Sequence, residues 1–202
     1  MSSSRHAGLV AVVERLKDGL IIEADYAQLS AADHDRALGF RVLAAAAIEH
    51  YIEDLCLFTA RTGAARIRSN QPTRTGRALL IWLIGRLEGP SIPLREAELV
   101  LDALAVEDAL QRYEKSVSSN HGIKRKAVER LVAPLGLPLG QPDEVLLDRL
   151  DALADSRNVA AHLRVNRAKT MGPPIAEWEP VKDILDGLGT LDSALQQAST
   201  SF

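Results

Sequence analysis

Apolar residues recur at intervals of three and four along most of the chain, and this spacing limits what the chain can fold into. In residues 8 to 28, Leu9, Val13, Leu16 and Leu20 follow it, which is typical of one face of a helix. Signals for strands are scarce: no alternating apolar stretches are joined by a hairpin turn, and aromatic residues make up only 4% of the chain. We therefore expect an all-α fold, a bundle of about six or seven helices.

The same spacing predicts where the helices lie. The longest begins at Ser30, which with Asp33 resembles a capping box, and runs to about Thr62, where Gly63 is a plausible stop. The others are expected at residues 8–28, 78–87, 95–117, 123–132, 142–165 and 180–197. At 202 residues the chain has room for one well-formed core, so we expect a single helical domain spanning residues 1–202.

The charge balance and the single cysteine exclude several classes of protein. The formal net charge is -3, so no overall positive field favours nucleic acid or an anionic membrane, and any RNA contact must be local. Cys56 is the only cysteine, which excludes an intrachain disulfide and a multi-cysteine zinc site. Charged residues interrupt the apolar runs before they reach the length of a membrane span. We expect a cytoplasmic protein with no membrane partner, no cofactor and no metal.

An arginine continues a stripe of leucines on the helix expected from residue 142. At about 100° per residue, Leu146, Leu150, Leu153 and Arg157 fall within a narrow arc. A buried guanidinium needs partners for five donors and a compensating charge. Either the stripe reaches a cleft at Arg157, or this residue is paired.

A histidine and an asparagine follow Arg157 on the same helix. Asn158 and His162 are four residues apart and share a face, so the amide is placed to orient the imidazole. Arg157 and His162 are five apart, roughly 140° around an ideal helix. One straight helix would not direct both at one atom, whereas two copies of the helix across a dimer axis would bring them together. A local distortion of the helix is the alternative.

Arginine and histidine together suit cleavage of the RNA backbone without a metal. A neutral imidazole takes the proton of the ribose 2'-hydroxyl, and a guanidinium holds the charged phosphate. The spacing alone is weak evidence, because Arg157 and His162 are equally compatible with a surface arginine and a capping histidine.

Two longer segments sharpen this interpretation. The segment D-S-R-N-V-A-A-H, residues 155 to 162, resembles the R-N-x-x-A-H signature of HEPN domains. Residues 119 to 136, S-N-H-G-I-K-R-K-A-V-E-R-L-V-A-P-L-G, are similar to a block of the HEPN group called RiboL-PSP, and A-I-E-H-Y-I-E-D-L resembles its first core helix. The resemblance covers about residues 40–165 and leaves the helices at 8–28 and 180–197 as extensions.

The resemblance implies a fold and an activity. HEPN proteins are helical and usually dimeric, and many are metal-independent endoribonucleases of toxin-antitoxin or antiviral defence systems. It implies catalytic roles for Arg157 and His162, a supporting role for Asn158, and products ending in a 2',3'-cyclic phosphate. The expected partners are RNA, a second copy of the chain and an antitoxin or other protein. Non-catalytic HEPN modules also exist, so a dimerisation or partner-binding module is the alternative.

Residues around the second block are candidate contacts for the substrate. Asn120 and Lys124 lie at an expected loop-to-helix junction, where Lys124 would meet an RNA phosphate. A simpler interpretation of Asn120 is a helix cap. Glu49 and Glu53 lack the paired histidines of a metal site, but either is available to neutralise Arg157. The sequence does not choose between them.

Overall fold

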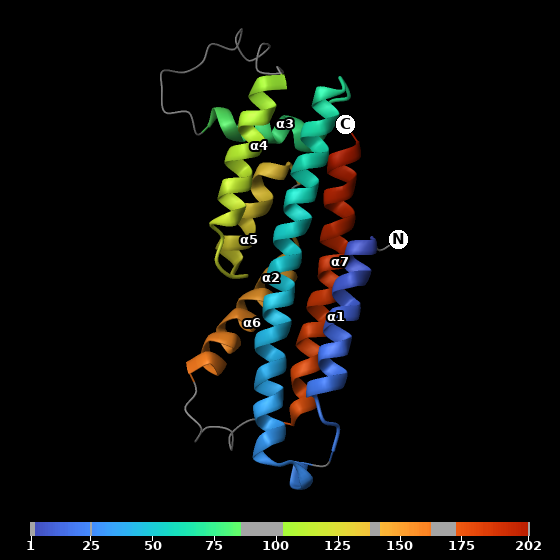
Figure 1. Ribbon diagram of the computed structural model, residues 1–202, viewed down its shortest axis with the longest axis vertical. Coiled ribbons are helices and arrows are strands. Elements are labelled where there is room, and N and C mark those ends of the chain that lie inside the picture. Colours follow the sequence, from blue (N-terminus) through green and yellow to red (C-terminus); the bar gives the residue numbers. More distant parts are fainter. Residues whose placement is uncertain (1–2, 25, 86–102, 138–141, 163–172, 202) are drawn as a thin grey trace. The chain divides into compact units, whose positions relative to one another are not determined.

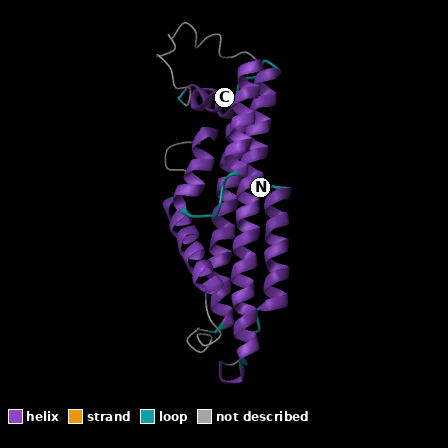
Figure 2. Ribbon diagram, turned by 60° about the vertical axis from the view of Figure 1, so that its left-hand side comes forward, coloured by secondary structure: helices purple, strands orange, loops and turns teal. Residues whose placement is uncertain are grey.

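The structure is a computed structural model that describes residues 3–24, 26–85, 103–137, 142–162 and 173–201. Within these ranges the chain forms seven α-helices and no strand (Figures 1 and 2), so the expected all-α fold is confirmed. The helices are α1 (Ser4–Leu20), α2 (Ala31–Arg68), α3 (Arg74–Ile84), α4 (Ala103–Ser118), α5 (Arg125–Val132), α6 (Glu144–His162) and α7 (Trp178–Thr200). Among them, no helix is long and apolar enough to cross a bilayer.

The chain divides into two compact units, each assembled from three separate stretches of sequence. Unit 1 comprises Met1–Tyr51, Gly122–Arg125 and Asp143–Thr190. Unit 2 comprises Ile52–His121, Lys126–Pro142 and Leu191–Phe202. Helices α2, α5 and α7 therefore contribute residues to both units. The expectation of a single domain stays a prediction.

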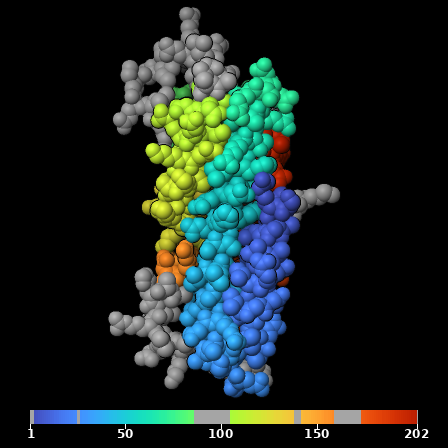
Figure 3. Space-filling view, in the orientation of Figure 1, coloured from blue at the N-terminus to red at the C-terminus, as the bar shows by residue number. Residues whose placement is uncertain are grey.

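Unit 1 contains α1, the first part of α2, α6 and most of α7. Its core is formed by large apolar side chains that are almost fully buried, including Val13, Phe40, Ile48, Leu150 and Ile184. Figure 3 shows α1 alongside the first half of α2, where the rings of His6 and Tyr51 meet edge to face.

Helix α1 begins and ends earlier than the predicted range of 8–28. It begins at Ser4 because the Ser3 hydroxyl accepts a hydrogen bond from the amide of His6 at 3.1 Å, which caps the first turn. It ends at Leu20 because Ile21 takes an extended conformation, with φ at -97°, and buries its side chain.

Helix α2 has the predicted start but not the predicted end. The capping box is confirmed: the Ser30 amide donates to Asp33 Oδ2 at 2.9 Å, and the Asp33 amide donates to Ser30 Oγ at 3.3 Å. The stop at Gly63 is wrong, because α2 continues to Arg68. Gly63 is a contact point instead, since a Cβ there would lie 2.8 Å from Thr75 Cγ2 on α3.

Unit 2 contains the rest of α2, α3, α4, α5 and the end of α7. Helix α4 lies along the second half of α2 (Figure 3), and the ion pairs Arg61–Glu114 and Arg68–Glu107 join the two helices. In the core, the Tyr113 hydroxyl donates to the Leu131 carbonyl of α5 at 2.7 Å. The predicted end of this helix at residue 132 is confirmed, and a 3-10 turn over Ala133–Leu135 then leads to Gly136 in the left-handed region, with φ at 72°.

The remaining helices differ from prediction mainly at their ends. Helix α6 begins at Glu144 rather than at Pro142, because the Asp143 carboxylate accepts from the amide of Val145 at 3.3 Å and caps the first turn. Helix α7 exceeds the predicted 180–197 by two residues at its start and three at its end. The expected helical residues 86–87, 95–102 and 163–165 lie outside the described residues.

Candidate functional site

The leucine stripe of α6 is buried, and it leads to Arg157. Leu146, Leu150 and Leu153 are each at most 7% exposed, whereas the Arg157 side chain, one turn further along the same face, is 34% exposed. The predicted stripe is therefore confirmed. The Arg157 side chain lies at its edge, partly exposed to solvent.

Arg157 is paired with Glu49 of α2. Its Nη1 donates to Glu49 Oε2 at 3.1 Å, and the glutamate side chain is 19% exposed. Both residues belong to unit 1. Of the two glutamates available to neutralise Arg157, the structure selects Glu49.

The other carboxylate oxygen of Glu49 holds the loop that precedes α5. It accepts a short hydrogen bond from the backbone amide of Gly122. Gly122 has φ at 96°, in the left-handed region that favours glycine. One carboxylate thus joins α2 both to α6 and to Gly122, so the part of the second resembling segment that belongs to unit 1, Gly122–Arg125, is connected to the first.

The structure describes part of the predicted Asn158–His162 pair. The Asn158 side chain is exposed, and it makes no hydrogen bond with the described residues. His162 is the last residue of α6, but its side chain lies outside the described residues. The expected approach of the imidazole to Asn158 or to Arg157 stays a prediction.

The basic residues of the loop are bound to acidic residues of α6. Lys124 Nζ lies 2.5 Å from Asp155 Oδ1, and this hydrogen bond raises the pKa of the lysine above its ordinary value. The Arg125 guanidinium contacts the carboxylates of Glu144 and Asp148, which raises its pKa in the same way. Lys124, the predicted RNA contact, is exposed, but a phosphate would have to compete with Asp155 for it.

An acidic residue of α6, rather than Asn120, caps α5. The backbone amide of Arg125, the first residue of α5, donates to Asp151 Oδ1 at 2.6 Å. The interpretation of Asn120 as the cap is therefore wrong, because the helix begins five residues after it. The sequence analysis does not predict this role of Asp151. The signal that could have found it is an acidic face of α6, where acidic residues are spaced by four, three and four: Glu144, Asp148, Asp151 and Asp155.

Asn120 is held inside unit 2. Its side chain is 6% exposed, Nδ2 donates to Glu53 Oε1 at 3.0 Å, and Oδ1 accepts from Arg130 Nη2 at 3.1 Å. The second glutamate of α2 therefore anchors the asparagine and not Arg157. Contact between Asn120 and RNA stays a prediction, and the burial of its amide argues for a positioning role.

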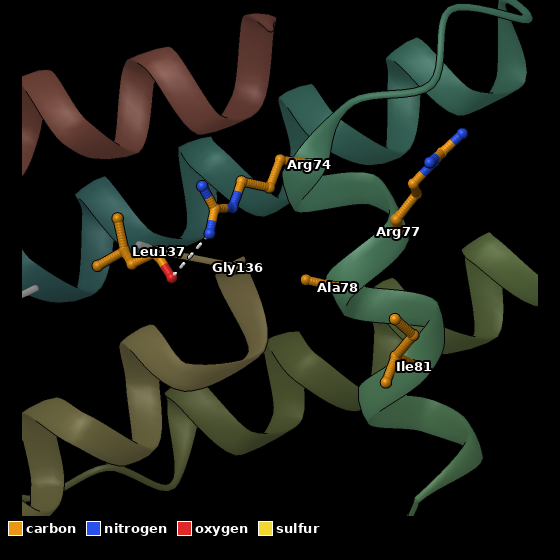
Figure 4. Close-up of a pocket in the computed structure, with 6 residues that line it drawn as sticks. All are labelled: Arg74, Arg77, Ala78, Ile81, Gly136 and Leu137. Atoms are coloured by element: carbon orange, nitrogen blue, oxygen red, sulfur yellow. Dashed lines mark hydrogen bonds between the residues drawn. The ribbon is translucent and has the colours of Figure 1, made fainter. Parts of the chain in front are cut away.

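A hollow of about 310 Å³ lies beside α3 in unit 2 (Figure 4). Its lining residues come from α3 and the turn after α5: Arg74, Arg77, Ala78, Ile81, Gly136 and Leu137. Arg74 Nη2 donates to the Leu137 carbonyl at 3.5 Å, and Figure 4 shows Arg77 pointing away from that carbonyl. This hollow contains no residue that the sequence predicts for the site.

Among the described residues, no group of three or more histidine, cysteine, aspartate or glutamate side chains is arranged to hold a metal ion. Comparison with protein-family models, with curated proteins and with solved structures finds no match for this chain. The candidate site therefore rests on the motif and on the geometry around Arg157.

Proposed function

We propose that this chain is a metal-independent endoribonuclease of the HEPN type, acting as a homodimer in which Arg157 and His162 of two copies form a composite site. The observation that carries the proposal is the placement of Arg157. It ends a buried leucine stripe, remains partly exposed, and is held by one carboxylate to the N-H-G-I-K loop.

The proposed reaction uses the two motif side chains in separate roles. His162 takes the proton of a ribose 2'-hydroxyl as general base. The deprotonated oxygen attacks the neighbouring phosphorus, the bond to the 5'-oxygen of the next nucleotide breaks, and this leaving oxygen takes up a proton from solvent water. Arg157 stabilises the charge that develops on the phosphate oxygens. The products are a 2',3'-cyclic phosphate and a free 5'-hydroxyl, and DNA is not a substrate because it lacks the 2'-hydroxyl.

Before substrate binds, Glu49 neutralises the charge of Arg157 and holds its guanidinium in one position. The carboxylate neutralises the guanidinium through Nη1, and the other guanidinium nitrogens donate no hydrogen bond to the described residues. In this proposal a phosphate binds those nitrogens while Glu49 holds Nη1. In this proposal Glu49 is a positioning residue, and Asn158 orients the imidazole of His162.

The alternative is a non-catalytic HEPN module that uses the same helix for dimerisation or to bind a partner protein. The neutralised state of Arg157 and Lys124 favours this alternative, because paired cations attract phosphate less strongly than free ones.

An RNA-cleavage assay without metal ions distinguishes the endoribonuclease from the non-catalytic binding module. Purified protein is incubated with mixed RNA in EDTA, alongside Arg157→Ala and His162→Ala. Arg149→Ala is the matched arginine control, since Arg149 lies on α6 and pairs with Asp183 at 2.9 Å. His50→Ala is the histidine control, since His50 is exposed on α2. The proposal requires cleavage by wild type and both controls, and roughly a hundredfold or greater loss in the two motif variants. RNA that stays uncleaved in every sample supports the non-catalytic binding module.

A mixing experiment tests the composite site. If each centre takes Arg157 from one protomer and His162 from its partner, a mixture of the Arg157→Ala and His162→Ala proteins contains mixed dimers with one intact centre. After exchange of protomers, roughly a quarter of wild-type activity should return. No recovery, with exchange of protomers verified, contradicts a shared centre.

The proposal extends to a cellular setting. We infer a cytoplasmic protein of a toxin-antitoxin or antiviral system, with an antitoxin or other protein as a regulatory partner. Growth arrest on expression that His162→Ala relieves would support this setting, and equal growth of cells expressing either protein would contradict it.

A further inference from the structure

A hollow of about 490 Å³ in unit 2 is lined by basic and hydroxyl side chains. Arg112, Lys115, Ser116 and Ser119 come from the last turns of α4 and the residue after it, and Arg130 comes from α5. Among the described residues, no acidic side chain lines the hollow. Arg112 is paired with Asp108, whereas Lys115 and Arg130 form no ion pair with the described residues. In the Lys124–Arg125 region of unit 1, by contrast, each cation faces a carboxylate.

Many hydrogen-bond donors at this hollow have no partner among the described residues. Lys115 Nζ and the Ser116 hydroxyl donate no hydrogen bond there. Arg112 uses only Nε, which contacts the two oxygens of Asp108 at 3.0 and 2.9 Å. Arg130 uses only Nη2, which donates to Asn120. Among the described residues, the terminal nitrogens of Arg112 and the Nε and Nη1 of Arg130 have no hydrogen-bond partner.

The arrangement suits an extended anion better than a small one. Arg112, Lys115, Ser116 and Ser119 are spaced by three, one and three residues, so they share one helical face. At 1.5 Å per residue this face is about 10 Å long, enough for two or three consecutive phosphates of a nucleic-acid strand. Arg130 adds a donor from a second helix.

We propose that this hollow binds the phosphate backbone of a single RNA strand. The choice of RNA as ligand rests on the proposed function, whereas the choice of phosphate rests on the three cations and the open donors. Among the described residues, no aromatic side chain lines the hollow for base stacking, so binding should depend little on sequence and strongly on salt.

The test measures equilibrium binding of a 2'-O-methyl oligouridine 12-mer to the full chain. This strand cannot be cleaved by 2'-hydroxyl attack, so the binding result is independent of the chemistry at Arg157 and His162. Lys115→Glu is the principal variant, because Lys115 is exposed and its ammonium group makes no contact with the described residues. Lys182→Glu is the matched control: this lysine is exposed on α7 and likewise makes no such contact.

For three phosphate contacts, log K should fall with log salt with a slope of about -2. Lys115→Glu should weaken binding roughly fivefold and make the slope shallower by about one unit or slightly less, while Lys182→Glu leaves both unchanged. Equal weakening by the two variants, or none by Lys115→Glu, overturns the proposal.

Competition distinguishes a strand from a free phosphate. Millimolar inorganic phosphate or pyrophosphate should displace the 12-mer no better than sulfate at equal ionic strength. Saturable pyrophosphate binding that Lys115→Glu abolishes, without binding of the 12-mer, overturns the proposal in favour of a small-anion site. Strand binding without RNA cleavage by wild type would leave this inference standing and contradict the proposed function.

Discussion

Arg157 on α6 donates a hydrogen bond to Glu49, 108 residues earlier in the chain, at 3.1 Å. The two side chains are 34% and 19% exposed, so water screens their attraction less than it does that of a fully exposed pair. The same carboxylate also accepts from Gly122. Glu49 therefore connects the motif helix to the loop that resembles the second HEPN segment.

A double-mutant cycle should detect this relationship. Arg157→Ala and Glu49→Ala should couple by about 0.5–1.5 kcal/mol in the free energy of unfolding, since the pair is partly buried. Denaturant unfolding of wild type, the two single variants and the double variant gives the value. The Arg149–Asp183 pair, 42% and 47% exposed, is the control and should couple less. A coupling no greater than that of the control would show that the ion pair contributes little in solution.

Two glycines of α2 should respond oppositely to alanine. At Gly63 a Cβ would lie 2.8 Å from Thr75 Cγ2 and 2.9 Å from the backbone nitrogen of Gly76, so Gly63→Ala should destabilise the protein by about 1–3 kcal/mol. At Gly39 a Cβ would meet nothing within 4 Å, so Gly39→Ala should stabilise it by roughly 0.5–1 kcal/mol. Thermal or denaturant unfolding measures both. Stabilisation by Gly63→Ala would contradict the close packing of α2 on α3.

Gly63 also shows what a sequence can and cannot predict. Helix positions follow from local periodicity and caps, so the all-α fold, the Ser30–Asp33 capping box and the buried leucine stripe were predictable. A glycine in a helical pattern fits either a stop or a close contact with another helix. Only the tertiary packing of Thr75 against Gly63 decides between them.

Part of the candidate site was likewise predictable from the sequence, and part depends on tertiary packing. The unusual position of Arg157 at the end of a leucine stripe predicted a partner, but Glu49 and Glu53 are one turn apart on α2 and fit that role equally well from sequence. The choice depends on how α6 packs against α2, which involves residues more than 100 positions apart. The cap of α5 by Asp151 has the same non-local origin.

The thiol of Cys56 should be inert in the folded protein. The side chain is fully buried, and burial raises its pKa to about 12, so almost no thiolate exists near neutral pH. Ellman's reagent at pH 8 should find less than one reactive thiol per chain in native buffer, and one in guanidinium chloride. Complete reaction of the native protein within minutes would contradict the burial of this residue.

The cap of α2 should contribute a pH-dependent stability. Hydrogen bonds from the Ser30 side chain and then its backbone hold the pKa of Asp33 below its ordinary value of 3.8. The charged form is favoured on folding, so the stability gained is complete above the unfolded pKa and is lost as the pH falls through the folded one. Relative to wild type, Asp33→Ala should be less stable at pH 7.

The control for the cap is Asp35→Ala, because Asp35 is exposed on the same helix and its carboxylate makes no hydrogen bond with the described residues. Denaturant unfolding between pH 7 and pH 2 should show the deficit of Asp33→Ala shrinking below about pH 4, with a smaller deficit for the control. A deficit that grows on acidification would reverse the inferred sign.

The central claim is most directly tested by the chemistry of the product ends. Wild type and His162→Ala are incubated in EDTA with an RNA oligonucleotide and with its all-2'-deoxy counterpart, and the ends are identified by mass spectrometry. The proposed function predicts 2',3'-cyclic phosphate and 5'-hydroxyl ends from RNA with wild type alone, and an intact deoxy strand. Undiminished formation of these ends by His162→Ala, or RNA left intact by wild type, would contradict it.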